Sequence, residues 1–76
     1  MTEYDILRQQ LQKARADAGL TQSQLAQLLD KTQSYVSKIE SGERQIDIIE
    51  FMRWCECCGA NAVTVLRKVL PPAAKK

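Results

Sequence analysis

Apolar residues along the chain recur at steps of three and four, the spacing that gathers them on one face of a helix. The first such series predicts a helix over about residues 3–18. Gly19 follows it, and glycine readily adopts the left-handed conformation that ends many helices. The residues of this series are Leu7, Leu11, Ala14 and Ala18.

The next stretch predicts two short helices joined by a tight turn. Thr21 and Gln24 have the spacing of a capping box, which predicts a helix over about residues 22–29. Thr32 is the next N-cap and predicts a helix over about residues 33–41. Two helices in this arrangement are the elements of a helix-turn-helix.

The helix predicted over residues 33–41 has two unlike faces. Val36 and Ile39 are three residues apart and point inward, where they join the apolar residues of the preceding helix. Asp30, in the turn, tolerates a positive φ, although less well than glycine does. The outward face is polar and rich in hydrogen-bonding groups: Gln33, Ser34, Ser37 and Lys38.

Two further N-caps, Asp47 and Asn61, predict the last two helices. The first covers about residues 48–58, and the second runs from Asn61 to Pro71-Pro72. The predicted apolar side of the first consists of Ile48, Phe51, Met52, Cys55 and Cys58. The apolar residues of the second are Ala62, Val63, Leu66, Val69 and Leu70, and Val65 widens this apolar area.

Composition supports one small all-helical domain. The chain has 76 residues, 45% of them hydrophobic, and only three glycines and two prolines to interrupt helices. We therefore expect a single domain over residues 1–72, followed by a short basic tail at 73–76. The formal net charge of +2 alone does not identify a nucleic-acid partner.

Several classes of function fit the sequence poorly. Histidine, the commonest general base and metal ligand, is absent, and no Gly-rich phosphate loop or paired-acid arrangement stands out. Neither a membrane-spanning apolar run nor a signal-peptide pattern is present. We expect a cytoplasmic, non-enzymatic protein without a membrane partner, cofactor or small-molecule effector.

The three cysteines are clustered at Cys55, Cys57 and Cys58. An odd count without an export signal argues against a disulfide framework, and a zinc site would need a second ligand pair. Cys55 and Cys58 are spaced to be buried on one helical face, whereas Cys57 is the more exposed thiol. We therefore expect no metal site, and a redox role stays open.

From Leu7 to Gly59 the chain resembles the Cro/phage-repressor type of helix-turn-helix, often called the XRE family. The resemblance covers about fifty of 76 residues, with its motifs in the expected order and spacing. It implies a five-helix bundle of the lambda-repressor-like type. The matching motifs are Leu7-Arg8, Ala14-Arg15, Gly19-Leu20-Thr21-Gln22, Gln24-Leu25-Ala26, Thr32 to Glu40 and Gly42-Glu43-Arg44.

The resemblance also implies roles for individual residues. Gln33 matches the position that reads a base edge, and its amide can pair bidentately with adenine. Arg15 and Glu40 match an internal salt bridge and are expected to be structural. The other expected base contacts are Ser34, Ser37 and Lys38, and the expected contacts to the DNA backbone are Gln22, Tyr35 and Arg44.

A single helix-turn-helix reads only a short half-site, so dimerisation would double the recognised sequence. We therefore expect a homodimer on double-stranded DNA that binds an inverted-repeat operator, most often as a repressor. The expected dimer interface lies on the last predicted helix and on neighbouring residues of the helix over about 48–58. Its residues on the last helix are Val63, Val65, Leu66, Val69 and Leu70.

The alternative function is a helix-turn-helix protein-interaction module, such as the antitoxin-type partner of another protein. The outer face of the helix over 33–41 distinguishes the two functions. A protein-binding face would more often carry an apolar anchor, and this face is polar and lacks acids.

Overall fold

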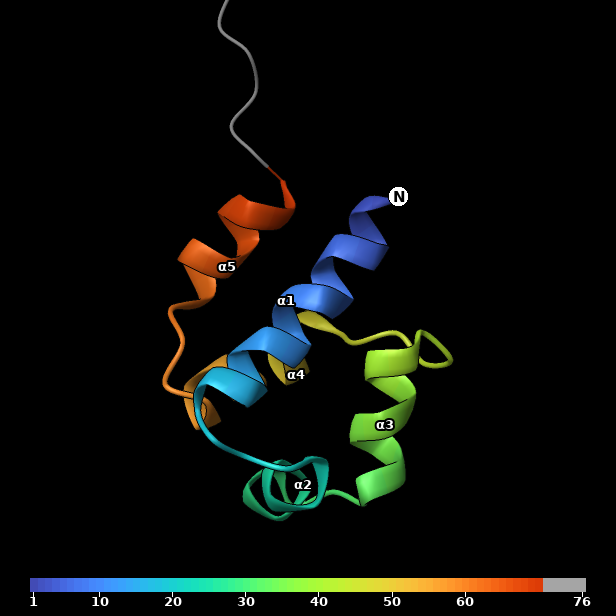
Figure 1. Cartoon of the computed structure of the whole chain (residues 1–76), viewed down its shortest axis with the longest axis vertical. Coiled ribbons are helices and arrows are strands. Elements are labelled where there is room, and N and C mark those ends of the chain that lie inside the picture. Colours follow the sequence, from blue (N-terminus) through green and yellow to red (C-terminus); the bar gives the residue numbers. More distant parts are fainter. Residues whose placement is uncertain (71–76) are drawn as a thin grey trace, which may run out of the picture.

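The computed structural model describes residues 1–70, which form five α-helices joined by short connections (Figure 1). The all-helical architecture expected from the sequence is confirmed. The predicted Pro71-Pro72 boundary and basic tail lie outside the described residues. The helices are α1 (Glu3–Asp17), α2 (Gln22–Leu29), α3 (Gln33–Ser41), α4 (Ile48–Cys57) and α5 (Ala62–Val69).

Each of these five helices begins at a side chain that accepts a hydrogen bond from the first turn. Such caps satisfy backbone N–H groups that have no partner within the helix. Ala18 and Cys58, which were expected inside helices, are instead the C-caps of α1 and α4. The caps are Thr2, Thr21, Thr32, Asp47 and Asn61.

The helices pack around one core with α1 through its middle (Figure 1). Trp54 of α4 is fully buried, and its indole Nε1 donates a hydrogen bond to the Leu11 carbonyl of α1 at 3.0 Å. This bond satisfies the one polar atom of a large apolar side chain. The other core residues are Leu25, Ala26, Val36, Ile39, Phe51, Cys55 and Val65.

The predicted apolar side of α4 was partly wrong. Ile48 and Met52 are exposed, whereas Phe51 and Trp54 are buried. Both sides of α4 carry apolar residues, so their spacing could not decide which side faces the core. The two large rings take the inward positions, which turns Ile48 and Met52 to the surface.

Candidate nucleic-acid interface

The α2–α3 turn is built on one left-handed residue. Asp30 has φ 58° and ψ 44°, and within residues 1–70 it is the only non-glycine residue with a positive φ. The chain then turns back closely enough for the Lys31 N–H to donate to the Ala26 carbonyl at 2.8 Å. Ala26 is buried in the core, and a small side chain at this position suits the close packing of α2 against α3.

This turn presents a polar face of α3 to solvent. Val36 and Ile39 are buried on the inner side and set the rotation of the helix. Within residues 1–70, the four outward side chains have no hydrogen bond to another protein group, so their donors and acceptors are available to a ligand. These side chains are Gln33, Ser34 and Lys38, which are exposed, and Ser37, which is half-buried.

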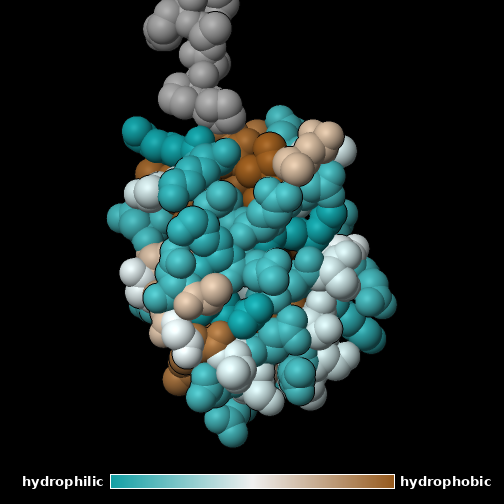
Figure 2. All heavy atoms as spheres, viewed as in Figure 1, coloured by the Kyte–Doolittle hydropathy of each residue, from teal (hydrophilic) through white to brown (hydrophobic). Residues whose placement is uncertain are grey.

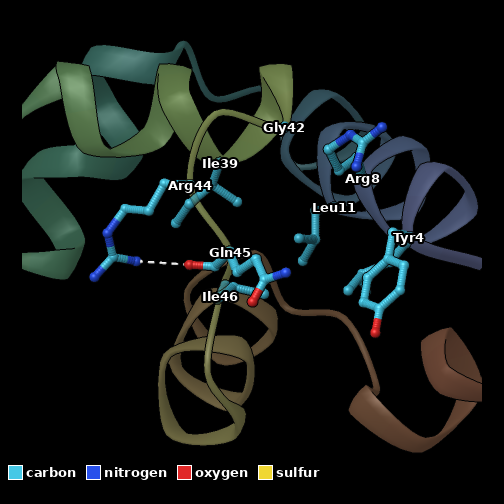
Figure 3. A pocket seen from close by; sticks show the side chains of 9 residues that line it. Tyr4, Arg8, Leu11, Ile39, Gly42, Arg44, Gln45 and Ile46 are labelled. Atoms are coloured by element: carbon cyan, nitrogen blue, oxygen red, sulfur yellow. Dashed lines mark hydrogen bonds between the residues drawn. The ribbon is translucent and has the colours of Figure 1, made fainter.

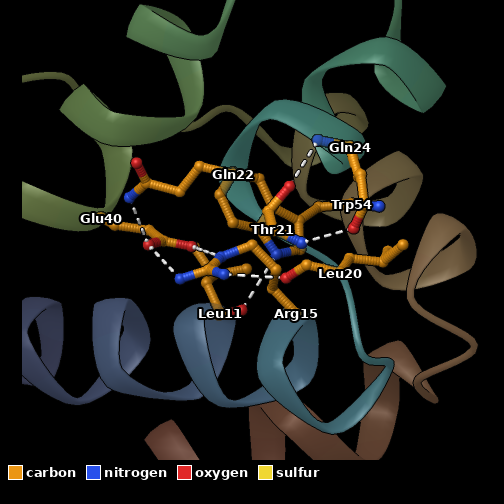
Figure 4. Close-up of polar contacts among 8 residues, drawn as sticks. All are labelled: Leu11, Arg15, Leu20, Thr21, Gln22, Gln24, Glu40 and Trp54. Carbon is orange, nitrogen blue, oxygen red and sulfur yellow. Dashed lines mark hydrogen bonds and ion pairs between the residues drawn. The ribbon is translucent and has the colours of Figure 1, made fainter.

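An ion pair fixes α3 against α1. Arg15 donates from Nε and Nη2 to the two carboxylate oxygens of Glu40, at 2.7 and 3.0 Å (Figure 4). Its Nη1 donates to the Leu20 carbonyl at 2.9 Å. The side chains are only 14% and 5% exposed, so both charges are largely removed from water. The hydrogen bond to Glu40 raises the pKa of Arg15.

Gln22 joins the same cluster from the first residue of α2. Its Nε2 donates to Glu40 Oε1 at 2.9 Å, so three helices meet at one carboxylate (Figure 4). A Gln amide nitrogen has two hydrogens, and this bond occupies one of them. Gln22 is half-buried, and its bond to Glu40 holds the side chain in place beside the N-terminus of α2.

A second guanidinium–carboxylate pair lies on the connector after α3. Arg44 donates from Nη1 and Nη2 to the two oxygens of Glu50, at 3.1 and 3.0 Å, and from Nη1 to the Gln45 carbonyl at 3.0 Å. The Arg44 guanidinium also lies 4.8 Å from the centre of the Tyr35 ring. Arg44 is thus next to α3 and already engaged by an acid.

This second pair changes the acid–base properties of its members. The hydrogen bond from Arg44, followed by that from the Asp47 backbone, lowers the pKa of Glu50 to about 2. Burial, with a smaller contribution from the Glu50 charge, raises the pKa of Tyr35 to about 12. Tyr35 is therefore a neutral hydroxyl and an aromatic surface at any ordinary pH.

Lys31 and Glu50 lie beside Tyr35 and Arg44, although the sequence did not predict either as a site residue. The Lys31 ammonium lies 5.3 Å from the Tyr35 ring centre, so two cations flank one aromatic side chain. Such contacts stabilise cations over an aromatic face. Glu50 stands three residues after its cap Asp47, and this spacing was the one available signal that its side chain would be fixed.

A small cavity of about 140 Å³ lies between α1 and the connector after α3 (Figure 3). Its volume is below the roughly 300–1,000 Å³ of typical ligand pockets. Arg44 extends to the opposite side of the connector from Tyr4 and Arg8. The polar face of α3 is therefore a stronger candidate site than this cavity.

The expected dimer interface on α5 needs a correction. Val65 and Val69 are buried against the rest of this chain, so they belong to its core and not to an outer surface. They are four residues apart on the side of α5 that packs against α1, and the other three residues expected at the interface lie on the outside. Those residues are Val63, Leu66 and Leu70, all exposed.

The three cysteines are free thiols. Cys55 is buried and the other two are half-buried; burial raises the pKa of Cys55 and raises that of Cys58 to about 11. Neither of these two thiols is the reactive thiolate at neutral pH. Among residues 1–70, no group of His, Cys, Asp or Glu side chains is arranged to hold a metal ion.

With this geometry in place, comparison with known proteins identifies the family. The helix-turn-helix family model matches residues 11–63, which include all of α2, α3 and α4. The chain belongs to the Cro/phage-repressor type of helix-turn-helix, the XRE family. No curated protein matches the chain.

Two solved structures are similar to this helix-turn-helix protein over nearly their whole length. An XRE-family like protein from Pseudomonas syringae pv. tomato str. DC3000 is 42% identical, with a TM-score of 0.85 over 92% of this chain and 88% of that one. The clp gene regulator ClgR from C. glutamicum is 25% identical, with a TM-score of 0.82 over 100% of this chain and 99% of that one. Among residues 1–70, no helix combines the length and apolar character needed to cross a bilayer.

Proposed function

We propose that this helix-turn-helix protein is a sequence-specific transcription regulator that places α3 in the major groove of double-stranded DNA. The supporting observation is the outward face of α3, which is polar and largely exposed, on a helix tied to α1 by the Arg15–Glu40 ion pair. An α-helix fits the major groove, where each base pair presents a distinct pattern of donors and acceptors. Occupying a promoter in this way would block transcription sterically, which favours repression.

The side chains divide into two groups in this proposal. Gln33, at the first turn of α3, reads a base through its amide, with Ser34, Ser37 and Lys38 beside it. Gln22, Tyr35 and Arg44 contact the DNA backbone and set the register. Gln22 retains one Nε2 hydrogen for a phosphate after its bond to Glu40.

Dimerisation through α5 completes the proposal. Hydrophobic surface gathers at the end of the molecule where α5 ends (Figure 2). Val63 and Leu66 on α5 and its C-cap Leu70 are exposed apolar residues. Burying this surface against a second copy would place two recognition helices on one side of the DNA. The operator would then be an inverted repeat with half-sites about one helical turn apart.

The first experiment is selection of a random duplex DNA pool on the pure protein at near-physiological salt, followed by sequencing. We expect enrichment of a two-fold symmetric site. Recovery of nothing above background would contradict DNA recognition and favour the protein-interaction alternative. A single, non-repeated half-site would retain DNA binding but contradict the dimer.

Two variants then separate base reading from backbone contact. Gln33→Ala should relax the preference at one base position by about 1–3 kcal/mol of discrimination. Arg44→Ala should weaken binding to all sequences evenly and flatten the dependence of affinity on salt. Equal losses on every sequence from both variants would contradict this division.

The dimer has a matched pair of surface variants. Val63 on α5 and Leu28 on α2 are 58% and 57% exposed, so a lysine at either position has similar access to water. Val63→Lys should shift sedimentation toward the monomer, whereas Leu28→Lys should not. A wild-type chain that sediments as a monomer at micromolar concentration, with and without the selected DNA, would contradict the interface.

A further inference from the structure

Arg44, the proposed backbone contact, is already held by this chain before any DNA arrives. Glu50 and the Gln45 carbonyl together accept three hydrogen bonds, two from Nη1 and one from Nη2. A guanidinium has five N–H groups in a fixed planar arrangement. Within residues 1–70, the Nε hydrogen and the second Nη2 hydrogen of Arg44 have no protein acceptor. These two hydrogens point the same way and form the Nε–Nη2 edge of the planar guanidinium.

The position of the guanidinium is also restricted. Its face lies 4.8 Å from the ring centre of Tyr35, a residue of α3, and Glu50 is fixed at the first turn of α4 by its reciprocal bonds with Asp47. Arg44 therefore bridges the recognition helix and the helix that follows it. Its side chain is still 42% exposed, so the open edge is accessible to a ligand.

We propose that Glu50 is a positioning residue for DNA binding: it holds Arg44 against Tyr35 with the Nε–Nη2 edge open for a phosphate. This inference rests on the proposed function. An arginine can offer two parallel N–H groups to a phosphate, and ordering its long side chain before binding lowers the entropy lost in the complex. Glu50 itself touches no DNA in this arrangement.

Simple electrostatics predicts that neutralising Glu50 strengthens DNA binding, whereas a positioning role predicts that it weakens binding. The direction of the change in affinity therefore tests the role of Glu50. An acid beside a phosphate-binding arginine repels DNA, so its removal should strengthen binding. If Glu50 positions Arg44, removal should weaken binding even though the protein becomes more positive. A purely structural role for Glu50 would lower stability without a specific dependence on Arg44.

Glu50→Gln is the informative variant because glutamine still serves the capping box with Asp47. Its amide nitrogen, however, replaces the oxygen that accepts from Arg44 Nη2, so two donors face each other. On the selected operator we expect affinity to fall about 3-fold to 10-fold, the size expected from losing the order of one long side chain. Glu50→Asp keeps the charge but is one methylene shorter, and it should also lose affinity.

Glu43→Gln is the matched control. Glu43 is an exposed acid on the same connector whose carboxylate accepts from Ser41 rather than from an arginine. Its neutralisation should leave affinity unchanged or raise it. In the Arg44→Ala background, Glu50→Gln should no longer weaken binding. Unfolding of each variant is followed by Trp54 fluorescence, and DNA affinities are compared only under conditions in which every variant is folded.

The outcomes separate this inference from the proposed function. A wild-type chain that selects no DNA overturns both. A wild-type chain that binds its operator, with Glu50→Gln and Glu50→Asp binding as tightly or more tightly, overturns the positioning role alone. An equal loss from Glu50→Gln with and without Arg44 also overturns it.

Discussion

Two guanidinium–carboxylate pairs, Arg15–Glu40 and Arg44–Glu50, lie at α3 and the connector after it. They differ mainly in their access to water. Arg15 and Glu40 are 25 residues apart in sequence, and their side chains are 14% and 5% exposed. Arg44 and Glu50 are six residues apart, and their side chains are 42% and 16% exposed. Both pairs are bidentate, so geometry alone does not distinguish them.

Their surroundings explain what each pair can do. The buried pair has further protein partners, Gln22 and the Leu20 carbonyl, which satisfy polar atoms that water cannot reach. The exposed pair has an aromatic ring on one side and solvent on the other. A buried pair therefore supports the fold, whereas an exposed pair leaves an arginine available to a ligand.

The largest expected effect is the loss of the buried arginine. Arg15→Ala leaves Glu40 charged and largely buried, which should cost about 3–5 kcal/mol of the free energy of unfolding. Arg44→Ala leaves Glu50 in contact with water and should change stability far less. Urea unfolding followed by Trp54 fluorescence measures both variants. Similar losses from the two would show that burial does not separate the pairs.

Gln22→Ala removes one of the extra partners of the buried pair. A hydrogen bond to a charged group contributes about 1.5–3 kcal/mol, so the loss should fall in that range and below that of Arg15→Ala. Gln27→Ala, an exposed glutamine on the same helix, is the control and should be nearly neutral. If both glutamine variants cost the same, Glu40 does not depend on its amide partner.

Gly42 joins the two regions, since it ends the helix that carries Glu40 and begins the connector that carries Arg44. Its φ of 88° makes Gly42→Ala unfavourable by about 1–2 kcal/mol. A Cβ there would also lie 2.9 Å from Arg8 Cζ, whereas at Gly19, with φ 74°, it would meet nothing within 4 Å. Gly19→Ala measures the backbone strain alone.

The additional crowding at Gly42 comes from the far end of a flexible side chain, so its cost should be small. Thermal melting of Gly42→Ala with and without Arg8→Ala isolates it. We expect the cost of Gly42→Ala in the Arg8→Ala background to fall to that of Gly19→Ala. A loss at Gly42 smaller than at Gly19 would contradict this account.

The smallest expected effect is a titration in the exposed pair. The pKa of Glu50 is about 2, below its ordinary 4.5, so its contribution to stability is present above pH 4.5 and is lost as the pH falls toward 2. Arg44→Ala removes the main cause, and the pKa should rise toward 4.5 but stay below it, because the Asp47 N–H still donates. Carboxyl NMR titration would show this; an unchanged pKa would contradict the pairing.

Sequence patterns predicted the helices well because their signals are local. Caps such as Thr21, turn residues such as Asp30 and inward pairs such as Val36 and Ile39 depend on neighbours a few residues away. The Arg15–Glu40 pair is too distant in sequence for spacing to reveal, and only the family resemblance pointed to it. The capping box at Thr2 was missed although its signal is of the same local kind.

The remaining errors concern helices that are apolar on more than one side. On α4 and α5, spacing could not decide which side contacts the core, and Val65 and Val69 were assigned to the wrong side. The Arg44–Glu50 pair was missed because the two residues are six apart across a connector. Helix periodicity brings together residues three or four apart, so it does not predict this contact. Whole-fold packing, rather than any local pattern, determines these positions.

The side-chain caps at the starts of all five helices of residues 1–70 also bear on how fast the chain folds. Each helix carries its own start signal, and the connections between helices are short, so few distant segments must meet before structure forms. Small helical domains with such local contacts fold in microseconds to milliseconds. A newly made chain would therefore spend little time with its apolar side chains exposed to other molecules.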